Sequence, residues 1–258
     1  MTGVVLVTGA AGRIGTALRT RIARPGRTLR LLDVAPLGEL APGEEAVRTS
    51  LADAESVAAA CEGVDAIVHL AGIPTESTYD EIQTVNVEGT RAVLEGARQH
   101  GVGRLLYASS NHAVGFARRQ DEPLPADTPF APDTWYGWSK TAAESMCALY
   151  HHRFGIDVVS LRIGTCFLKP PHVRALATWL SFDDAGRLVE AALTVPSPGF
   201  AHVWGVSANQ RRWWSLAEGE AIGYHPQDDA EVFADGLTGE DSDYVGGEYT
   251  TLPLGVRR

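Results

Sequence analysis

The pattern of apolar and polar positions predicts short β-strands that alternate with amphipathic helices along most of the chain. The strands are short, apolar, β-branched runs that end in glycine or in polar residues. The predicted strands cover 4–8, 29–33, 46–49, 65–71, 104–109, 156–163 and 202–206. The predicted helices cover 13–22, 54–61, 79–99, 135–154 and 183–194. This alternation predicts an α/β fold, a Rossmann-type doubly wound parallel sheet.

The pattern becomes less regular in the last third of the chain, where prolines and tryptophans interrupt it. We therefore expect a Rossmann domain over 1–165 and a small C-terminal substrate lobe over 166–258, packed together as one structural unit. The lobe would contain the helix 183–194 and the strand 202–206. The acidic, glycine-rich stretch 236–247 predicts a mobile tail.

A helix that begins near Tyr136 places Tyr136 and Lys140 on one face, because the two residues are four positions apart. A free phenol has a pKa of about 10, and a neighbouring ammonium group favours the phenolate and lowers that pKa. Tyr136 can therefore accept a proton from a substrate hydroxyl. Taken alone, a Tyr and a Lys at this spacing can equally be a chance pair on the surface.

A glycine-rich turn follows the first predicted strand, with Gly9, Gly12 and Gly15 in a variant of the dinucleotide-binding spacing. Glycine lets the backbone approach a diphosphate closely, and the next helix offers unpaired N–H groups and a positive dipole end. We therefore expect the diphosphate of a dinucleotide at this turn, which also contains Arg13 and Ile14.

The second predicted strand ends in Asp33, where a carboxylate can accept hydrogen bonds from the adenosine ribose. An acid there repels a 2′-phosphate, so NAD is expected in preference to NADP, although Arg13 and Arg30 keep NADP open. Asp53 has two interpretations. It can cap the helix that follows it, and it can contact adenine.

Further candidates lie where later strands end. The loop after 65–71 would lie over the cofactor through Leu70, Ala71 and Gly72. Ser110 can share a hydrogen bond with a substrate hydroxyl and the catalytic phenol, or it can belong to an ordinary strand-end turn. Arg174 can grip a carboxylate with two parallel hydrogen bonds, or it can be an ordinary surface arginine.

The composition narrows the class of partner. The formal net charge is −10, from 32 acidic and 22 basic residues. This balance argues against nucleic acid or an anionic membrane and favours a small molecule. Three scattered cysteines predict neither a disulfide framework nor a metal site, which fits a reducing cytoplasm. No targeting segment is expected before the first strand, and no apolar run approaches the roughly 20 residues of a membrane helix.

A series of motifs resembles the extended short-chain dehydrogenases/reductases. The motifs are Thr8-Gly9-x-x-Gly12-x-x-Gly15, the strand end at Asp33, His69-Leu70-Ala71-Gly72, Asn86-Val87-x-Gly89-Thr90, Ser109-Ser110 and Tyr136-x-x-x-Lys140. Further motifs resemble the NAD-dependent uronate dehydrogenases of that family over nearly the whole chain. They include Ser109-Ser110-Asn111-His112-x-Val114-Gly115, Leu161-Arg162-Ile163-Gly164-Thr165-Cys166, Arg174-x-Leu176-x-Thr178-Trp179 and Trp213-Trp214.

The resemblance implies NAD-dependent oxidation of the anomeric C1 hydroxyl of a hexuronic acid, galacturonate or glucuronate, to an aldarolactone. Tyr136 would be the general base, Lys140 would lower its pKa and hold the nicotinamide ribose, and Ser110 would orient the C1 hydroxyl. The implied substrate contacts are completed by Arg174 for the carboxylate and by Thr75, Asn111, His112 and Thr165. By the same analogy a homo-oligomer is expected, with the helix that carries Tyr136 at its interface.

Two alternatives stay open. A nucleotide-sugar epimerase or dehydratase on the same scaffold would use Tyr136 and Lys140 but keep its NAD bound through a cycle. The short stretch after Cys166 argues against it, as does Asn111-His112, which stands where a dehydratase usually carries an acidic pair. A non-catalytic NAD sensor is the weaker alternative, because such sensors commonly lack the Tyr and the Lys.

Overall fold

The computed structural model describes residues 2–257. Its strands are β1 (Gly3–Thr8), β2 (Arg27–Asp33), β3 (Glu44–Arg48), β4 (Ala66–His69), β5 (Arg104–Ser110), β6 (Asp157–Ile163), β7 (Thr165–Cys166), β8 (Trp179–Leu180) and β9 (Phe200–Gly205). Its α-helices are α1 (Arg13–Arg21), α2 (Ala54–Ala60), α3 (Tyr79–Ile82), α4 (Gly89–Gln99), α5 (Trp135–Phe154), α6 (Ala175–Thr178), α7 (Phe182–Thr194) and α8 (Ala217–Ala221). Tighter or wider turns form η1 (Gln83–Glu88), η2 (Asn111–Val114), η3 (Ala230–Phe233) and η4 (Gly247–Thr251).

The predicted doubly wound sheet is confirmed. Seven strands lie in the order β3-β2-β1-β4-β5-β6-β9, and every neighbouring pair is parallel. β7 and β8 form a separate parallel pair. The direction of winding reverses between β1 and β4, which is where sheets of this kind bind their ligands, at the carboxyl ends of the strands.

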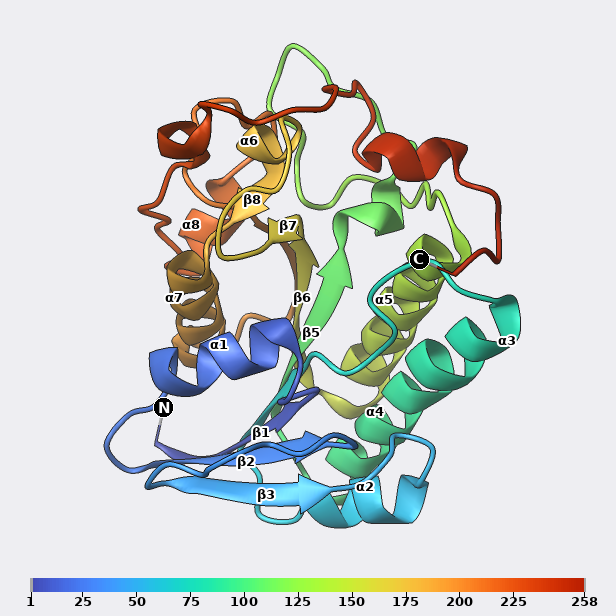
Figure 1. The fold of residues 1–258 in the computed structure, drawn as a ribbon. Helices are drawn as coiled ribbons and strands as arrows, with labels where there is room; N and C mark the ends of the chain where they lie inside the picture. The colour runs from blue at the N-terminus through green and yellow to red at the C-terminus, as the bar shows by residue number, and fades with distance from the viewer. Residues whose placement is uncertain (1, 258) are drawn as a thin grey trace.

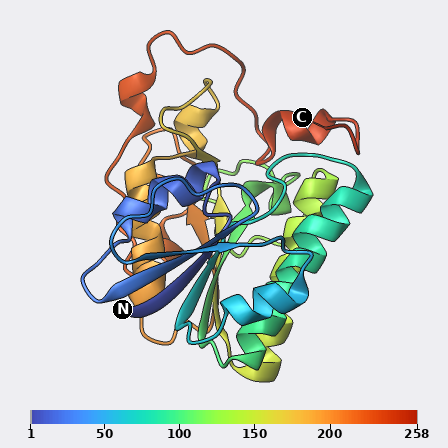
Figure 2. The same cartoon turned by 60° about the horizontal axis from the view of Figure 1, so that its bottom comes forward.

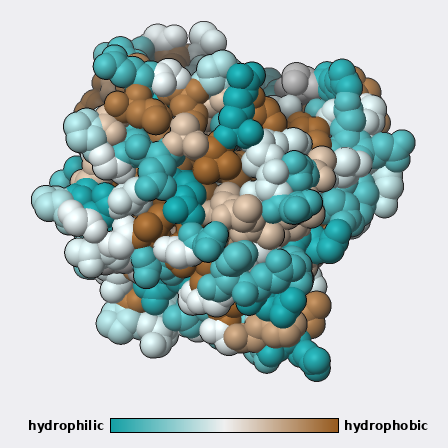
Figure 3. Space-filling view, turned by 90° about the horizontal axis from the view of Figure 1, so that it is seen from below, coloured by the Kyte–Doolittle hydropathy of each residue, from teal (hydrophilic) through white to brown (hydrophobic). Residues whose placement is uncertain are grey.

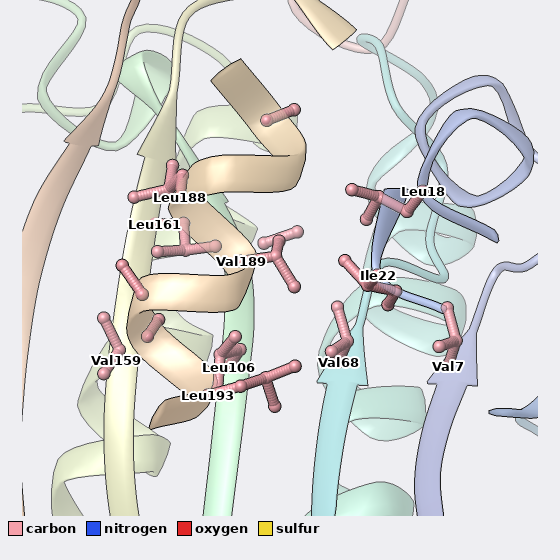
Figure 4. Close-up of a cluster of buried hydrophobic side chains, with 14 of the residues drawn as sticks. Val7, Leu18, Ile22, Val68, Leu106, Val159, Leu161, Leu188, Val189 and Leu193 are labelled. Carbon is pink, nitrogen blue, oxygen red and sulfur yellow. The ribbon is translucent and has the colours of Figure 1, made fainter. Parts of the chain in front are cut away.

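Helices cover both faces of the sheet (Figures 1 and 2). α1 and α7 pack on one face, and α2, α4 and α5 pack on the other. On the first face, Leu188 of α7 lies beside Leu161 of β6, and Ile22 at the end of α1 lies over Val68 (Figure 4). Each such buried side chain contributes roughly 1.5–3 kcal/mol, so the two helices are held firmly beside the strand ends.

The helix that carries Tyr136 begins and ends where the sequence predicts. Thr134 is its N-cap, and the Thr134 hydroxyl accepts a hydrogen bond of 3.0 Å from the N–H of Gly137. Gly155 ends it with a φ of 74°, a left-handed conformation that glycine adopts without strain. The cap fixes the first turn of α5, and with it the height of Tyr136 above the sheet.

The predicted boundary at residue 166 is wrong for two elements. β9 pairs in parallel with β6 along its whole length and completes the main sheet, and α7 packs against α1 and β5. Without β9, β6 would be an open edge with unpaired backbone groups, although its side chains are almost all buried. The chain therefore leaves the sheet after β6, forms part of the lobe, and then returns to the sheet.

The predicted helix 79–99 is continuous but not uniform. α3 passes into the π-helical η1 and then into α4. Asn86 lies in η1, and its amide bonds both backbone groups of Ile73, at 2.7 and 3.1 Å, and the Ser139 hydroxyl at 3.1 Å. The wider turn thus joins the loop after β4 to α5, and Asn86 has an architectural role.

The prediction of a mobile tail is wrong for the end of the stretch 236–247. Val245 is fully buried, its N–H bonds the Ala117 carbonyl at 2.9 Å, and the Gly246 N–H bonds the Gly115 carbonyl at 2.8 Å. From there residues 244–257, which we call the C-terminal segment, cross above the carboxyl end of β5 (Figure 1). Backbone groups make these contacts, so composition does not reveal them.

Among residues 2–257 we find no helix that combines the length and the apolar character needed to cross a bilayer. On the face seen from below in Figure 3, hydrophilic and hydrophobic side chains are interspersed.

Candidate active site

A cavity of about 860 Å³ opens at the carboxyl ends of β1, β4, β5 and β6. It brings together all but one of the residues predicted to bind cofactor or substrate. They are Gly9, Gly12, Arg13, Ile14, Gly15, Asp33, Leu70, Ala71, Gly72, Thr75, Ser110, Asn111, His112, Tyr136, Lys140, Thr165 and Arg174. Residues far apart in the sequence therefore face one space, as the strand order requires.

The glycine turn has the shape that a diphosphate needs. Gly9 has a φ of +71°, and a Cβ there would lie 2.7 Å from the backbone nitrogen of Ala71. A Cβ at Gly15 would lie 2.4 Å from the Gly9 carbonyl oxygen. The N-cap of α1 is Gly12, which has no side chain to satisfy the first N–H groups of the helix. Those groups line the cavity and suit an anion.

Asp33 stands at the edge of the cavity, at the end of β2. Its two carboxylate oxygens accept hydrogen bonds from the backbone N–H groups of Ala11 and Ala35, each at 2.9 Å. Arg30 points elsewhere, because its guanidinium bonds Glu45 and the carbonyls of Ala60 and Glu62. Arg30 therefore gives no support to a 2′-phosphate.

Arg13 does line the cavity, and its guanidinium carbon lies 3.7 Å from the centre of the Phe167 ring. Asp53 is the predicted residue that the cavity does not include. It caps α2, and its carboxylate accepts hydrogen bonds from the Ser56 N–H at 3.0 Å and the Ser56 hydroxyl at 2.7 Å. The structure supports the capping role, while Ala52, one residue earlier, faces the cavity.

Tyr136 and Lys140 lie together on the cavity side of α5. The Lys140 Nζ is 5.4 Å from the centre of the Tyr136 ring and donates a hydrogen bond of 2.8 Å to the Ala108 carbonyl. The Ser110 side chain, at the end of β5, faces the same cavity and lowers the pKa of Tyr136. The three predicted catalytic residues therefore form one group.

Burial dominates the electrostatics of this group. It raises the pKa of Tyr136 to about 12, against the hydrogen bond from Ser110, which lowers it. Burial also lowers the pKa of Lys140 to about 8, against the charge of Glu144, which raises it. The pKa of Tyr136 is therefore raised, not lowered as its spacing to Lys140 predicts. Burial removes the water that would stabilise the Tyr136 phenolate, and the Lys140 Nζ bonds the Ala108 carbonyl.

Arg174 lies at the far side of the cavity, where the C-terminal segment covers it. One of its terminal nitrogens donates a hydrogen bond to the Val245 carbonyl, which also accepts one from the Asn111 amide at 2.8 Å. Its Nε is buried without a hydrogen-bond partner. Burial lowers the pKa of Arg174, against the raising effect of several nearby acids. A buried N–H without a partner costs about 1–3 kcal/mol, so a carboxylate ligand would remove a real penalty.

The histidine and threonine of the predicted sugar site have ordered surroundings. The His112 Nδ1 lies 2.7 Å from a carboxylate oxygen of Asp133, and the ring centres of His112 and Tyr249 are 4.1 Å apart. The Thr165 hydroxyl shares a hydrogen bond of 2.8 Å with the Thr178 hydroxyl. These contacts fix the positions of the two side chains.

Sequence reasoning missed several residues of the site. Glu76 is buried and accepts hydrogen bonds from the backbone N–H groups of Tyr136 and Gly255. Asp133 lies in a proline-rich loop, where a single acid carries no signal. Glu248 and Tyr249 line the cavity from a stretch predicted to follow a mobile tail. Only the structure shows that Gly115, Gly137 and Gly246 surround Asp133, so the sequence holds no signal for it.

His69, within β4, is buried in the core. Its ring nitrogens bond the hydroxyls of Thr8 at 2.7 Å and Thr90 at 3.0 Å. Burial lowers the pKa of His69 to about 3, so the ring is neutral. Among residues 2–257, no cluster of three or more His, Cys, Asp or Glu side chains could hold a metal ion.

Known proteins resemble this chain along most of its length. The model of the NAD dependent epimerase/dehydratase family matches residues 5–181. The uronate dehydrogenase of Pseudomonas putida is 44% identical over 230 residues, which cover 89% of this chain and 85% of that protein.

Solved structures agree with the sequence comparison. A mutant of the uronate dehydrogenase from Agrobacterium tumefaciens, complexed with NAD, gives a TM-score of 0.91 at 38% identity, with 98% of both chains covered. The glucuronic acid dehydrogenase from Chromohalobacter salexigens gives 0.92 at 36% identity, also over 98% of both chains. The chain belongs to the NAD-dependent epimerase/dehydratase family, and within it is an NAD-dependent oxidoreductase of the uronate dehydrogenase group.

Proposed function

We propose that this protein oxidises the anomeric C1 hydroxyl of a hexuronic acid, galacturonate or glucuronate, to an aldarolactone with NAD as the oxidant. The observation that carries this proposal is the arrangement of one cavity. It has a proton-transfer group, Tyr136 with Ser110 and Lys140, and on another side a buried arginine whose Nε has no partner. Only a substrate with both an oxidisable hydroxyl and a carboxylate uses both features.

The residues of the glycine turn fit NAD. The N-terminus of α1 would hold the diphosphate, since its first N–H groups line the cavity beside Gly9 and Gly12. Asp33 would accept hydrogen bonds from the adenosine ribose and disfavour a 2′-phosphate. When bound, NAD supplies the hydride acceptor for the oxidation.

Tyr136 would remove the proton of the C1 hydroxyl while Ser110, which lines the same cavity, orients that hydroxyl. A phenol with a pKa of about 12 is protonated at neutral pH, so the reactive complex must favour the phenolate more than the free protein does. Lys140 supplies positive charge for this purpose within 5.4 Å of the ring.

Arg174 would read the substrate carboxylate through its Nε and a terminal nitrogen, in the paired geometry that guanidinium and carboxylate groups favour. Asn111, His112, Thr75 and Thr165 would contact the sugar hydroxyls between the carboxylate and C1. The interaction with Arg174 is made to a part of the substrate that does not react, so it serves to place C1 beside Tyr136.

One assay panel tests the proposal. NAD or NADP is combined with galacturonate, glucuronate, galactose or UDP-glucose, and nicotinamide reduction is followed by absorbance. We expect stoichiometric NADH from the two uronates with NAD, and little reduction with galactose or NADP. No reduction with any free uronic acid would overturn the proposal and favour a nucleotide-sugar epimerase or dehydratase that keeps its cofactor.

We also propose that the protein forms a homo-oligomer through α4 and α5, and that it works in a reducing cytoplasm. Leu149 and Phe154 of α5 are 55% and 49% exposed, so this helix offers apolar side chains to a partner subunit. All three cysteines are buried free thiols, which suits a reducing compartment. Light scattering after size exclusion tests the first part, since a mass of 27.6 kDa would indicate a monomer.

A further inference from the structure

Asp133 is a buried carboxylate beside the proposed sugar site. Its side chain has no exposed area, and one oxygen lies 2.7 Å from Nδ1 of His112. The other oxygen accepts a hydrogen bond of 3.0 Å from the Thr134 hydroxyl, which in turn caps α5. Burying an ionised carboxylate is costly unless it is well bonded, so these contacts require an explanation.

Three glycines from separate parts of the chain leave space for this carboxylate. A Cβ at Gly115, Gly137 or Gly246 would lie 2.0, 2.8 or 1.9 Å from an oxygen of Asp133. None of the three has a positive φ, so the backbone conformation does not require glycine at these positions. They are needed because a larger side chain would displace Asp133. The site of this carboxylate is therefore built by the whole fold.

The contact with Asp133 determines which nitrogen of His112 carries the proton. An ionised carboxylate can only accept hydrogen bonds, so the Nδ1 that faces it must be the donor. In the neutral ring, Nε2 then has a lone pair and is an acceptor. His112 lines the cavity, and its ring centre lies 5.7 Å from that of Tyr136 and 4.1 Å from that of Tyr249. Nε2 is the ring atom that remains for a ligand.

We propose that Asp133 is a positioning residue that fixes the tautomer of His112, so that Nε2 accepts a hydrogen bond from a ring hydroxyl of the sugar. The proposal rests on the proposed function, because the hydroxyl belongs to the substrate inferred above. Asp133 itself does not touch the substrate. It acts on the reaction through the orientation and the proton position of His112, whose ring also packs against that of Tyr249.

The tautomer can be measured in the free protein. Long-range ¹⁵N NMR distinguishes a protonated from an unprotonated ring nitrogen, and the signals lost in His112→Gln identify the ring among the eight histidines. We expect the proton on Nδ1 in the native chain and on Nε2 in Asp133→Ala, which lacks the acceptor. A native ring with its proton on Nε2 would overturn the proposal. This result does not depend on activity, so a failure of the proposed function would be seen separately.

A double-mutant cycle tests the consequence for catalysis. We expect Asp133→Ala to lower kcat/KM for a uronate about tenfold in the native background, the worth of one hydrogen bond. In the His112→Gln background the same change should have an effect of less than about twofold, because the residue through which it acts is gone. Equal losses in both backgrounds would mean that Asp133 serves the fold and not His112.

Gly115→Ala gives an independent test that leaves the carboxylate in place. Its Cβ would displace Asp133, so we expect a loss of kcat/KM comparable to that of Asp133→Ala and a loosened Nδ1 contact in the NMR spectrum. Gly103→Ala is the matched control, since nothing lies within 4 Å of a Cβ there and its φ is not positive. An effect of Gly103→Ala equal to that of Gly115→Ala would contradict the account.

Discussion

Glu76 accepts a hydrogen bond of 2.9 Å from the backbone N–H of Tyr136. Its other carboxylate oxygen accepts one of 2.8 Å from the N–H of Gly255, in the C-terminal segment. One buried side chain therefore joins the first turn of the catalytic helix to the segment that covers the cavity. The helix N-terminus also favours a negative charge at this position.

Glu76→Gln tests this link. An amide can accept from only one of the two N–H groups and presents a donor to the other, so we expect a loss of about 1–3 kcal/mol in the free energy of unfolding. Proteolysis of the C-terminal segment should become faster, and urea denaturation gives the stability. Glu81→Gln is the control, because the Glu81 carboxylate pairs with Arg257 of the same segment and accepts from the hydroxyls of Ser77 and Thr78, whereas the N–H of Tyr136 bonds Glu76. Equal effects of the two variants would contradict the link.

Arg174→Ala is expected to raise KM for uronates by about tenfold or more, since a buried charge-assisted pair is lost. The relative rate on neutral sugars such as galactose should improve, because they never used the guanidinium. Steady-state kinetics on both substrate classes provide the measurement. Equal losses on uronates and neutral sugars would mean that Arg174 does not read the carboxylate and only anchors Val245.

Lys140 should control the pH dependence of turnover. The base must be deprotonated, so kcat/KM is expected to rise with pH as Tyr136 ionises. Lys140→Met removes the positive charge that favours the phenolate and should move this rise to higher pH, whereas Lys140→Arg should keep it near its native position. The pH–rate profile of each variant gives the comparison. An unchanged rise in Lys140→Met would show that the charge has no part in activating Tyr136.

His69 should make the native fold sensitive to mild acid. Burial lowers its pKa to about 3, while an unfolded histidine has a pKa of about 6.5. As the pH falls below about 6.5, His69 binds a proton in the unfolded chain but stays neutral in the native chain. The free energy of unfolding therefore decreases. His69→Gln should be less stable at pH 7 but should lose less stability between pH 6.5 and 4.5. The exposed His100 provides the control, as His100→Gln should keep the native slope.

The sequence predicted most of the sheet and the catalytic group, because local chemistry carries both. Thr134 and Gly155 mark the ends of α5, and the spacing of Tyr136 and Lys140 follows from helical geometry. The place of β9 was not predicted. The apolar run 202–206 predicts a strand but does not show which strand it pairs with. The chain between β6 and β9 passes through the lobe, so the two strands are not consecutive in the sequence.

The missed parts of the site depend on contacts that leave little trace in the sequence. The C-terminal segment is held by the carbonyl of Val245 and the N–H of Gly255, and every residue except proline has both groups. Asp133 is recognisable only when Gly115, Gly137 and Gly246 are seen to meet around it. The pKa of Tyr136 likewise depends on burial, which the spacing to Lys140 does not reveal.

Tyr136→Phe provides the most direct test of the central claim. The ring keeps its contacts with His112 and its place in the helix, and only the hydroxyl that would take the proton is lost. Titration calorimetry should give an NAD affinity within about twofold of the native value, while kcat for uronate oxidation should fall by about 10²-fold or more. Native turnover in this variant would contradict the account, because the proton would then leave C1 by another route.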